Sequence, residues 1–240
     1  MANTYYEPGE QRAAKVNELF TRIAARYDLI NDLQSFGLHR HWKRQVVTEA
    51  RPRPGERALD LCCGTGDIAL QLARKGVQVV GLDFSERMLQ VARERQSKAN
   101  DVLPKIEFFL GDAQSIPFAD NSFDIITIGY GLRNLTSWEK GLREMDRVAR
   151  SGARIVALEF GKPENHVWRI IYENYLRLFS PALGLVFCGN AAAYSYILES
   201  LKNYPAQRAV AEKMQEMGFV NVRVINLLGG AMSINYGQKH

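Results

Sequence analysis

The chain has 240 residues, 46% of them hydrophobic, and a formal net charge of +5 at pH 7. This length favours a single α/β domain with one substantial core, and the modest charge, without a long Lys/Arg block, argues against nucleic-acid binding. The sequence offers no uncharged apolar run long enough to cross a bilayer and no signal-peptide core, so we expect a cytoplasmic protein whose membrane contact, if any, is peripheral.

Residues 12–50 are predicted to form a helical lid before the core. Apolar residues recur at helical spacing from Val16 to Tyr27, and the helix is expected to break near Asn31 and Asp32. The stretch that follows, SFGLHRHWKRQVV, interleaves Phe, Leu and Trp with His, Arg and Lys. This pattern fits a lid that meets a polar head group or a membrane surface, and it fits equally a solvated helix with a few buried anchors.

An apolar run, a glycine-rich turn, a helical pattern and a second apolar run follow one another over residues 58–84. Strand, turn, helix and strand form a βαβ unit, whose right-handed crossover leaves the ligand site at the carboxyl ends of the strands. We therefore expect a small molecule to lie above Gly64, Thr65 and Gly66.

The carboxylates near this turn indicate which ligand it binds. The turn also fits the dinucleotide fingerprint G-x-G-x-x-A, but Asp67 follows at the helix N-terminus, where its charge would repel a pyrophosphate. Asp60, Asp83 and Asp112 are each expected at the end of a strand. Such a crevice favours a cationic ligand with hydroxyl and amine groups, such as S-adenosylmethionine. Alternatively, Asp60 and Asp67 only cap turns and helices.

Strands and helices continue to alternate through the rest of the predicted core, residues 51–160. Apolar runs predict three further strands, at residues 106–110, 123–130 and 153–160. A helix precedes the last strand, and Thr136 with Glu139 is expected to form the capping box at its start. Alternation of this kind indicates a doubly wound, mostly parallel sheet.

Residues 161–205 interrupt the alternation with aromatic side chains at helical spacing. These side chains either pack as ordinary core or cap an apolar pocket suited to a long hydrocarbon substrate. Residues 206–240 hold a last helix and two apolar runs joined as a hairpin, which makes the final strand antiparallel. The chain, residues 1–240, is thus expected to be one domain with the Rossmann-like, seven-stranded, mostly parallel sheet of a class I methyltransferase, with helices on both faces and an N-terminal helical cap.

Four segments carry a more specific signature. They are SFGLHRHWKR at residues 35–44, LDLCCGTGD at residues 59–67, GDAQSIPFADNSFD at residues 111–124 and GYGLRN at residues 129–134. Together they resemble the ubiquinone/menaquinone biosynthesis C-methyltransferases, and the similarity covers nearly everything from Phe20 onward. The glycine turn is common to many methyltransferases, whereas the lid segment combined with GLRN is far more specific.

The resemblance and the carboxylate pattern together imply a set of residues that contact S-adenosylmethionine. These are Tyr27, Asp60, Gly64, Thr65, Gly66, Asp83, Asp112, Ala113 and Gly129. Asp83 would accept hydrogen bonds from both ribose hydroxyls, and Asp112 would accept one from the adenine amine. The glycines would let the backbone approach the methionine part. Tyr27 would close over the cofactor, although it could instead be a simple core aromatic. Gly129 stands where the family commonly has serine, so only a backbone contact is expected there.

Arg133 and Asn134 are, by the same resemblance, expected to face the substrate ring as catalytic residues. Arg133 cannot readily act as a base because its pKa lies above about 12, so it would stabilise a phenolate or orient a water. Alternatively, both residues only fix their loop. The implied substrate is a polyprenylated quinol methylated at a ring carbon, with demethylmenaquinol or demethylphylloquinol preferred over a benzoquinol of ubiquinone biosynthesis or a non-quinone small molecule.

The sequence is also compatible with two other functions and with more than one kind of partner. A nicotinamide-dependent oxidoreductase is disfavoured by Asp67, whereas a catalytically silent scaffold of a quinone-synthesis complex is not excluded. The three cysteines form neither a disulfide framework nor a metal spacing, so no metal is expected. Peripheral membrane contact and a homodimer are both compatible with the sequence.

Overall fold

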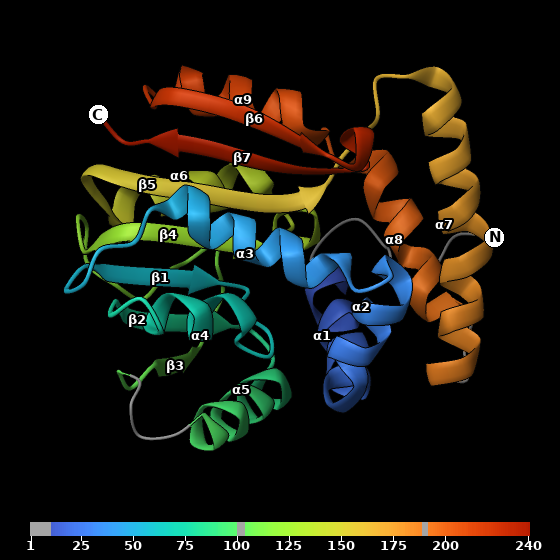
Figure 1. The fold of residues 1–240 in the computed structure, drawn as a ribbon, viewed down its shortest axis with the longest axis horizontal. Helices are drawn as coiled ribbons and strands as arrows, with labels where there is room; N and C mark the ends of the chain where they lie inside the picture. Colours follow the sequence, from blue (N-terminus) through green and yellow to red (C-terminus); the bar gives the residue numbers. More distant parts are fainter. Residues whose placement is uncertain (1–10, 100–103, 189–191) are drawn as a thin grey trace.

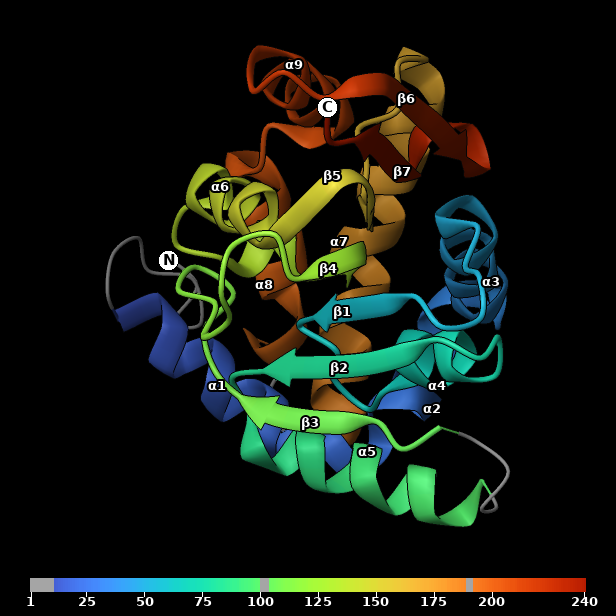
Figure 2. The same ribbon diagram turned by 90° about the vertical axis from the view of Figure 1, so that its left-hand side faces the viewer.

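A seven-stranded sheet runs through the part of the protein that this computed structural model describes, residues 11–99, 104–188 and 192–240 (Figure 1). Its strands are β1 (Arg57–Leu61), β2 (Gln78–Asp83), β3 (Glu107–Leu110), β4 (Phe123–Gly129), β5 (Ala149–Phe160), β6 (Val220–Leu227) and β7 (Met232–Gln238). They lie in the order β3-β2-β1-β4-β5-β7-β6, and Figure 2 shows the first five stacked in this order.

The pairing of the strands confirms the predicted fold class. β1 to β5 pair in parallel, whereas β7 is antiparallel to both β5 and β6. The central strand β1 is buried from Ala58 to Leu61 because helices cover both faces of the sheet. Its carboxyl end therefore opens into the glycine turn, where a parallel sheet of this type has its ligand site.

Helices form the other two layers and a cap. They are α1 (Gln11–Ile23), α2 (Tyr27–Ser35), α3 (Leu38–Ala50), α4 (Asp67–Ala73), α5 (Glu86–Lys98), α6 (Trp138–Val148), α7 (His166–Cys188), α8 (Ala192–Asn203) and α9 (Ala206–Glu216). One hydrophobic cluster joins α3 and α4 to one face of the sheet, and a second joins α6 and α9 to the other. Burial of both faces supplies most of the driving force for this layered arrangement.

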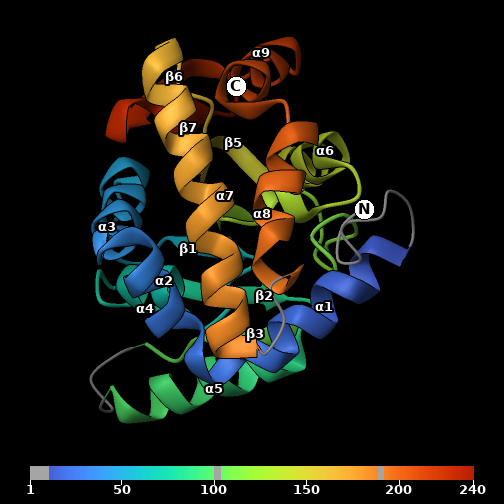
Figure 3. The same cartoon turned by 90° about the vertical axis from the view of Figure 1, so that its right-hand side faces the viewer.

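The cap covers the carboxyl edge of the sheet. Helices α1, α2, α7 and α8 come together there, α7 and α8 lying side by side (Figures 1 and 3). A third hydrophobic cluster holds them, with Leu19 from α1, Ile30 from α2, Leu176 from α7 and Ile197 from α8. The lid and the insertion, far apart in sequence, thus build one structure over the expected ligand site. No helix of the described residues is long and apolar enough to span a membrane.

The lid breaks earlier than predicted. A 3-10 turn at residues 24–26 separates α1 from α2, and α2 continues through Asn31 and Asp32 to Ser35. Asp32 does not disturb the helix because its carboxylate is bonded to His39 and Arg40 of α3 and does not compete for the backbone of α2. The helix ends instead where Phe36 adopts the left-handed conformation, φ 51°.

The start of α6 is also displaced by one residue from the prediction. Ser137, not Thr136, is the N-cap, and its hydroxyl accepts a hydrogen bond from the Lys140 backbone N–H at 3.1 Å. The same hydroxyl donates to Glu139 at 2.9 Å. The predicted capping box of Thr136 and Glu139 is therefore not formed, because Glu139 bonds the Ser137 hydroxyl while the Ser137 backbone N–H donates to Gln114 at 2.8 Å.

Candidate functional site

The glycine turn between β1 and α4 is held in a conformation that requires glycine. Gly64 and Gly66 have φ of 55° and 81°, in the left-handed region. A Cβ on Gly66 would also lie 3.2 Å from the Cβ of Ala92 on α5. The turn consequently presents bare backbone at the carboxyl end of β1, where a ligand can approach closely.

Two buried carboxylates flank this turn, one at the end of β1 and one at the end of β2. Asp60 accepts hydrogen bonds from the Thr127 hydroxyl at 2.7 Å and the Ala69 backbone N–H at 3.1 Å. Asp83 accepts from the backbone N–H groups of Gly64 at 2.8 Å and Ser85 at 2.9 Å.

Burial makes the ionised form of both carboxylates unfavourable. It raises the pKa of Asp60 to about 7 and the pKa of Asp83 to about 6, and the hydrogen bonds only partly offset it. Neither carboxylate has a cationic partner within hydrogen-bonding distance among the described residues. Each would therefore gain from a ligand that brings positive charge or hydroxyl donors.

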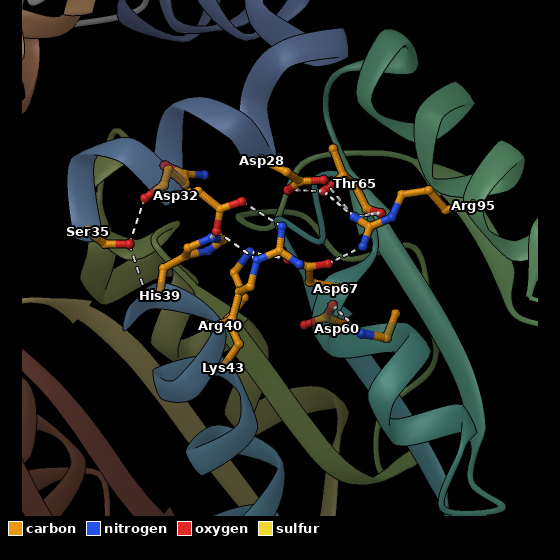
Figure 4. A network of polar contacts seen from close by, with 12 residues as sticks. Asp28, Asp32, Ser35, His39, Arg40, Lys43, Asp60, Thr65, Asp67 and Arg95 are labelled. Carbon is orange, nitrogen blue, oxygen red and sulfur yellow. Dashed lines mark hydrogen bonds and ion pairs between the residues drawn. The ribbon is translucent and has the colours of Figure 1, made fainter. Parts of the chain in front are cut away.

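Asp67, at the start of α4, differs from the expectation. Lys43 of α3 lies with its Nζ 2.6 Å from Asp67 Oδ2, and Arg95 of α5 forms a second ion pair with the same carboxylate (Figure 4). Although burial opposes ionisation, the charges of Lys43 and Arg95 outweigh it and lower the pKa of Asp67 to about 2. Asp67 is therefore ionised but compensated, and it adds little net negative charge to the crevice.

Arg95 joins the lid to the glycine turn. Its Nη1 lies 2.9 Å from Asp28 Oδ2 of α2 and donates to the Thr65 carbonyl at 3.0 Å and the Thr65 hydroxyl at 2.9 Å. The Thr65 hydroxyl in turn donates to Asp28 Oδ1 at 3.0 Å. With Asp67, these contacts tie α2, α4 and α5 to one guanidinium, as Figure 4 shows.

A small cavity of about 20 Å³ lies against the turn, roughly the space of one water. Its lining combines five of the predicted contact residues, namely Tyr27, Asp60, Gly64, Thr65 and Gly129. Asp83 adjoins it through its bond to Gly64, and Gly66 through the turn itself. Asp112 and Ala113 lie farther along the edge, after β3, where Asp112 is exposed and accepts from the Gln114 backbone N–H at 2.8 Å.

A larger cavity of about 350 Å³ lies between the lid and the insertion. Its lining is mainly apolar and aromatic, and includes Phe20, Ile23, Phe36, Trp42, Phe160, Trp168, Ile171, Tyr172, Tyr175, Leu176 and Met232. Tyr27 and Tyr130 line both cavities, so the two spaces adjoin at these side chains. Of the two alternatives for residues 161–205, the structure favours a pocket, with Leu183 and other residues packed as core behind it.

Arg133 lines the larger cavity, and Asn134 does not. The Arg133 guanidinium is buried, with Nη1 3.3 Å from Glu159 Oε1 and 2.9 Å from the Tyr130 carbonyl oxygen, and it lies 4.7 Å from the centre of the Phe160 ring. The Asn134 amide also donates to the Tyr130 carbonyl, at 3.1 Å. Both side chains therefore fix the loop that carries Tyr130, and Arg133 also reaches the cavity.

Sequence reasoning missed several of these groups. Lys43 was placed among solvated basic residues, yet it is buried, and its position four residues after His39 and three before Val46 on α3 was the available signal. Arg95, Asp28 and Glu159 had no signal, because their partners are remote in sequence. The Cys62 and Cys63 thiols are free and their pKa values are raised by burial. The Cys188 side chain lies outside the described residues.

Solved structures with this fold are methyltransferases in several cases. A SAM-dependent methyltransferase from Aquifex aeolicus superposes with a TM-score of 0.60 at 20% identity, covering 82% of this chain and 89% of that one. A phosphoethanolamine N-methyltransferase from Haemonchus contortus, solved with S-adenosyl-L-methionine, gives a TM-score of 0.61 at 17% identity over 83% of this chain and 52% of that one. At such identities the likeness concerns the fold.

Sequence comparison is more specific. A demethylmenaquinone methyltransferase of Desulfitobacterium hafniense is 40% identical over 96% of this chain and 92% of its own length. A ubiquinone/menaquinone biosynthesis C-methyltransferase UbiE of Francisella tularensis subsp. novicida is 39% identical over 97% of this chain and 94% of its own length. The model of the ubiE/COQ5 methyltransferase family matches residues 8–239. The resemblance seen in the sequence is thereby confirmed, and the chain belongs to the ubiE/COQ5 methyltransferase family.

Proposed function

We propose that this protein transfers the methyl group of S-adenosylmethionine to a ring carbon of a polyprenylated naphthoquinol, such as demethylmenaquinol or demethylphylloquinol. Family membership makes it a methyltransferase with S-adenosylmethionine as donor. One observation supports an acceptor with a hydrocarbon tail: the polar space beside the glycine turn adjoins, at Tyr27 and Tyr130, an apolar cavity of about 350 Å³. A ring placed at this junction would keep its hydrocarbon tail in the apolar cavity.

The residues around the turn fit the cofactor chemically. Asp60 and Asp83 are buried without cationic partners among the described residues, and the cofactor brings sulfonium and ammonium charges and ribose hydroxyl donors. Backbone at Gly64 and Gly66 would lie along its methionine part, Gly129 would offer backbone, and Thr65 would contribute from the same turn. Asp112 and Ala113 would lie beside the adenine, and Tyr27 would cover the cofactor from the lid.

When bound, S-adenosylmethionine supplies a methyl group whose bonding electron pair remains on sulfur. The chain has to position an electron-rich ring carbon against that methyl group and to stabilise charge on the ring oxygens. Arg133 reaches the cavity as a fixed cation and would stabilise a phenolate oxygen, while Asn134 holds the loop. Only the reduced quinol is electron-rich enough for this attack.

Methyl transfer can be tested directly. The protein is incubated with labelled S-adenosylmethionine, a reductant and either a demethylnaphthoquinol or a 2-methoxy-6-polyprenyl-benzoquinol, and the products are analysed by mass spectrometry. We expect methylation of the naphthoquinol, and none of the oxidised quinone. Preference for the benzoquinol would move the assignment to ubiquinone biosynthesis. Binding of cofactor without transfer to any quinol would favour a scaffold, and binding of NADH alone would favour an oxidoreductase.

We also propose that the mouth of the larger cavity contacts a membrane peripherally, on the cytoplasmic side. Phe36 and Ile171 line the cavity and yet are 77% and 51% exposed. Further apolar side chains are exposed on the same two helices, Leu29 and Leu33 on α2 and Val167, Ile170 and Leu178 on α7. A polyprenyl tail resides in the bilayer, so a cavity that opens through an apolar rim can receive it without exposing the tail to water.

Vesicle flotation tests this contact. We expect the protein to float with phospholipid vesicles, and the double variant Phe36→Glu/Leu178→Glu to lose flotation while it keeps its affinity for S-adenosylmethionine. Analytical ultracentrifugation of the same samples reports the oligomeric state. A dimer that dissociates in the double variant, without flotation of the unmodified protein, would show that this surface serves the expected homodimer and not a membrane.

A further inference from the structure

His39, near the start of α3, is oriented by a carboxylate. Its side chain is 2% exposed, and its Nε2 lies 2.9 Å from Asp32 Oδ1 of α2. Asp32 is held in turn by Arg40, whose Nε and Nη2 donate to the two carboxylate oxygens at 2.7 and 2.6 Å. These bonds from Arg40 keep the pKa of Asp32 well below its usual range. Because the carboxylate is ionised, Nε2 must donate, and the lone pair of the neutral ring is on Nδ1.

The other ring nitrogen is unused. His39 Nδ1 is buried and has no hydrogen-bond partner among the described residues. The His39 ring lines the larger cavity, as does Trp42. Lys43, one turn farther along α3, lines the small cavity against the glycine turn. His39 thus lies on the lid wall near the boundary between the two spaces, with Nε2 fixed by Asp32 and Nδ1 buried in the wall without a partner among the described residues.

The charges around the ring favour its neutral state. Burial lowers the pKa of His39, the nearby Lys43 lowers it further, and Asp32 and Asp67 only partly oppose this. At neutral pH the imidazole is therefore able to accept a proton. Arg40 is bonded to Asp32, and Arg133 also lines the larger cavity.

The other titratable groups along the larger cavity are not suited to accept a proton. Arg133 is a permanent cation. Burial raises the pKa of Tyr130 and Tyr172 well above the usual value, so both phenols stay protonated and cannot take a proton. Glu159, behind Arg133, is buried and paired with it. Among the described lining residues, His39 combines a basic nitrogen, a fixed tautomer and access to the cavity.

We propose that His39 is the general base of the methyl transfer, with Nδ1 taking a hydroxyl proton from the quinol ring and Asp32 acting as the positioning residue. The inference rests on the proposed function. The O–H bonding pair becomes the phenolate pair and enters the ring, and the ring carbon forms its bond to the methyl group as the sulfur–carbon bond breaks. The ring carbon then loses its own proton to solvent, the C–H pair restores the aromatic ring as a pair returns to the oxygen, and that oxygen takes back the proton held by His39.

The variant His39→Gln tests this role. The Gln amide reproduces the position of Nε2 and keeps the bond to Asp32, but it removes the basic nitrogen. We expect kcat at pH 7 to fall by about a hundredfold or more. The deficit should shrink toward pH 10, near the ordinary pKa of a phenol of about 10, because the quinol then ionises unaided. The exposed His41→Gln on the same helix is the matched control and should retain kcat.

Three further measurements separate a base from a structural residue. Isothermal titration should give His39→Gln the affinity of the unmodified protein for S-adenosylmethionine, within about twofold. Asp32→Asn should move the acid limb of the kcat profile to lower pH, because Asp32 supports the imidazolium. NMR of ¹⁵N-labelled histidine should show the Nε2–H tautomer for His39 in the free protein.

Several outcomes would overturn the proposal. A kcat of His39→Gln within threefold of the unmodified protein would do so, as would a deficit that stays constant between pH 6 and 10 or that follows a loss of cofactor affinity. An Nδ1–H tautomer would also contradict it. If the unmodified protein methylates no quinol at all, the proposed function itself fails and the role of His39 fails with it.

Discussion

Replacing Asp60 by Asn should stabilise the free protein at alkaline pH. The buried carboxylate accepts from the Thr127 hydroxyl and the Ala69 backbone N–H, and Asn can keep both contacts because the hydroxyl can reverse and accept from the amide. What the variant removes is the cost of an ionised group without a cationic partner. Burial raises the pKa of Asp60 from 3.8 to about 7, which corresponds to up to about 4 kcal/mol at about 1.36 kcal/mol per pKa unit.

The pH dependence fixes the sign of this effect. The folded-state pKa of Asp60 lies above the unfolded one, so the folded state binds more protons between pH 3.8 and about 7 and stability falls as the pH rises through this window. Well above pH 7 the full effect applies, and at pH 5 less than half of it, about 1.7 kcal/mol. Urea unfolding of the two proteins at pH 5 and pH 8 should therefore show that the advantage of Asp60→Asn is more than twice as large at pH 8.

Asp124→Asn is the matched control, at the opposite end of the sheet. Burial alone would raise the pKa of Asp124. The hydrogen bonds from the Arg57 backbone N–H and the Arg150 guanidinium outweigh burial, so the pKa of Asp124 lies below its usual value. Ionised Asp124 therefore stabilises the folded state above the pKa that the group has in the unfolded chain, and this stabilisation is lost in acid. The Asn variant should accordingly be less stable than the unmodified protein at pH 8. An Asp60→Asn protein that is also less stable at pH 8, or whose advantage does not depend on pH, would refute the reasoning.

Three other predictions follow from the site. Affinity for S-adenosylmethionine, measured by titration calorimetry from pH 5 to 8, should fall up to tenfold per pH unit below about 6, where Asp83 protonates; a flat profile would contradict this. Tyr130→Phe removes a buried hydroxyl without a hydrogen-bond partner among the described residues and should raise the free energy of unfolding by about 1 kcal/mol in urea; a loss would indicate a partner. Arg133→Ala should lower the free energy of unfolding in urea by about 3–5 kcal/mol, because Glu159 stays buried and unpaired. Arg133→Met/Glu159→Gln should recover that stability and still lack turnover. An active double variant would remove Arg133 from the mechanism.

The sheet could be predicted because buried parallel strands leave a strong local pattern. β1, β2 and β4 read as short apolar runs, and Asp60 and Asp83 lie at or near the ends of the first two. The predicted helix boundaries were wrong where the contacts of a side chain with a residue remote in sequence determine the boundary. Asp32 looked like a helix end, but its carboxylate is satisfied by α3, so α2 passes through it.

The site was predicted less completely than the sheet, and for a related reason. The glycine turn and the carboxylates lie close together in sequence, whereas Lys43 and Arg95 reach Asp67 from 24 and 28 residues away. An isolated sequence gives no means of pairing charges over such separations. Asp67, expected from the sequence to repel a phosphate as a free charge, is consequently neutralised by the fold.

The contacts of Arg95 have a consequence for the order of events in a catalytic cycle. Lifting α2 from the glycine turn breaks both contacts of Asp28, with the Arg95 guanidinium and with the Thr65 hydroxyl, together, so exchange of spent cofactor demands a concerted opening. The apolar cavity already reaches the surface at Phe36. With the proposed membrane contact, a methylated ring would leave into the lipid while the demethylated donor is still enclosed, so exchange of the donor, and not of the acceptor, is expected to limit the rate of turnover.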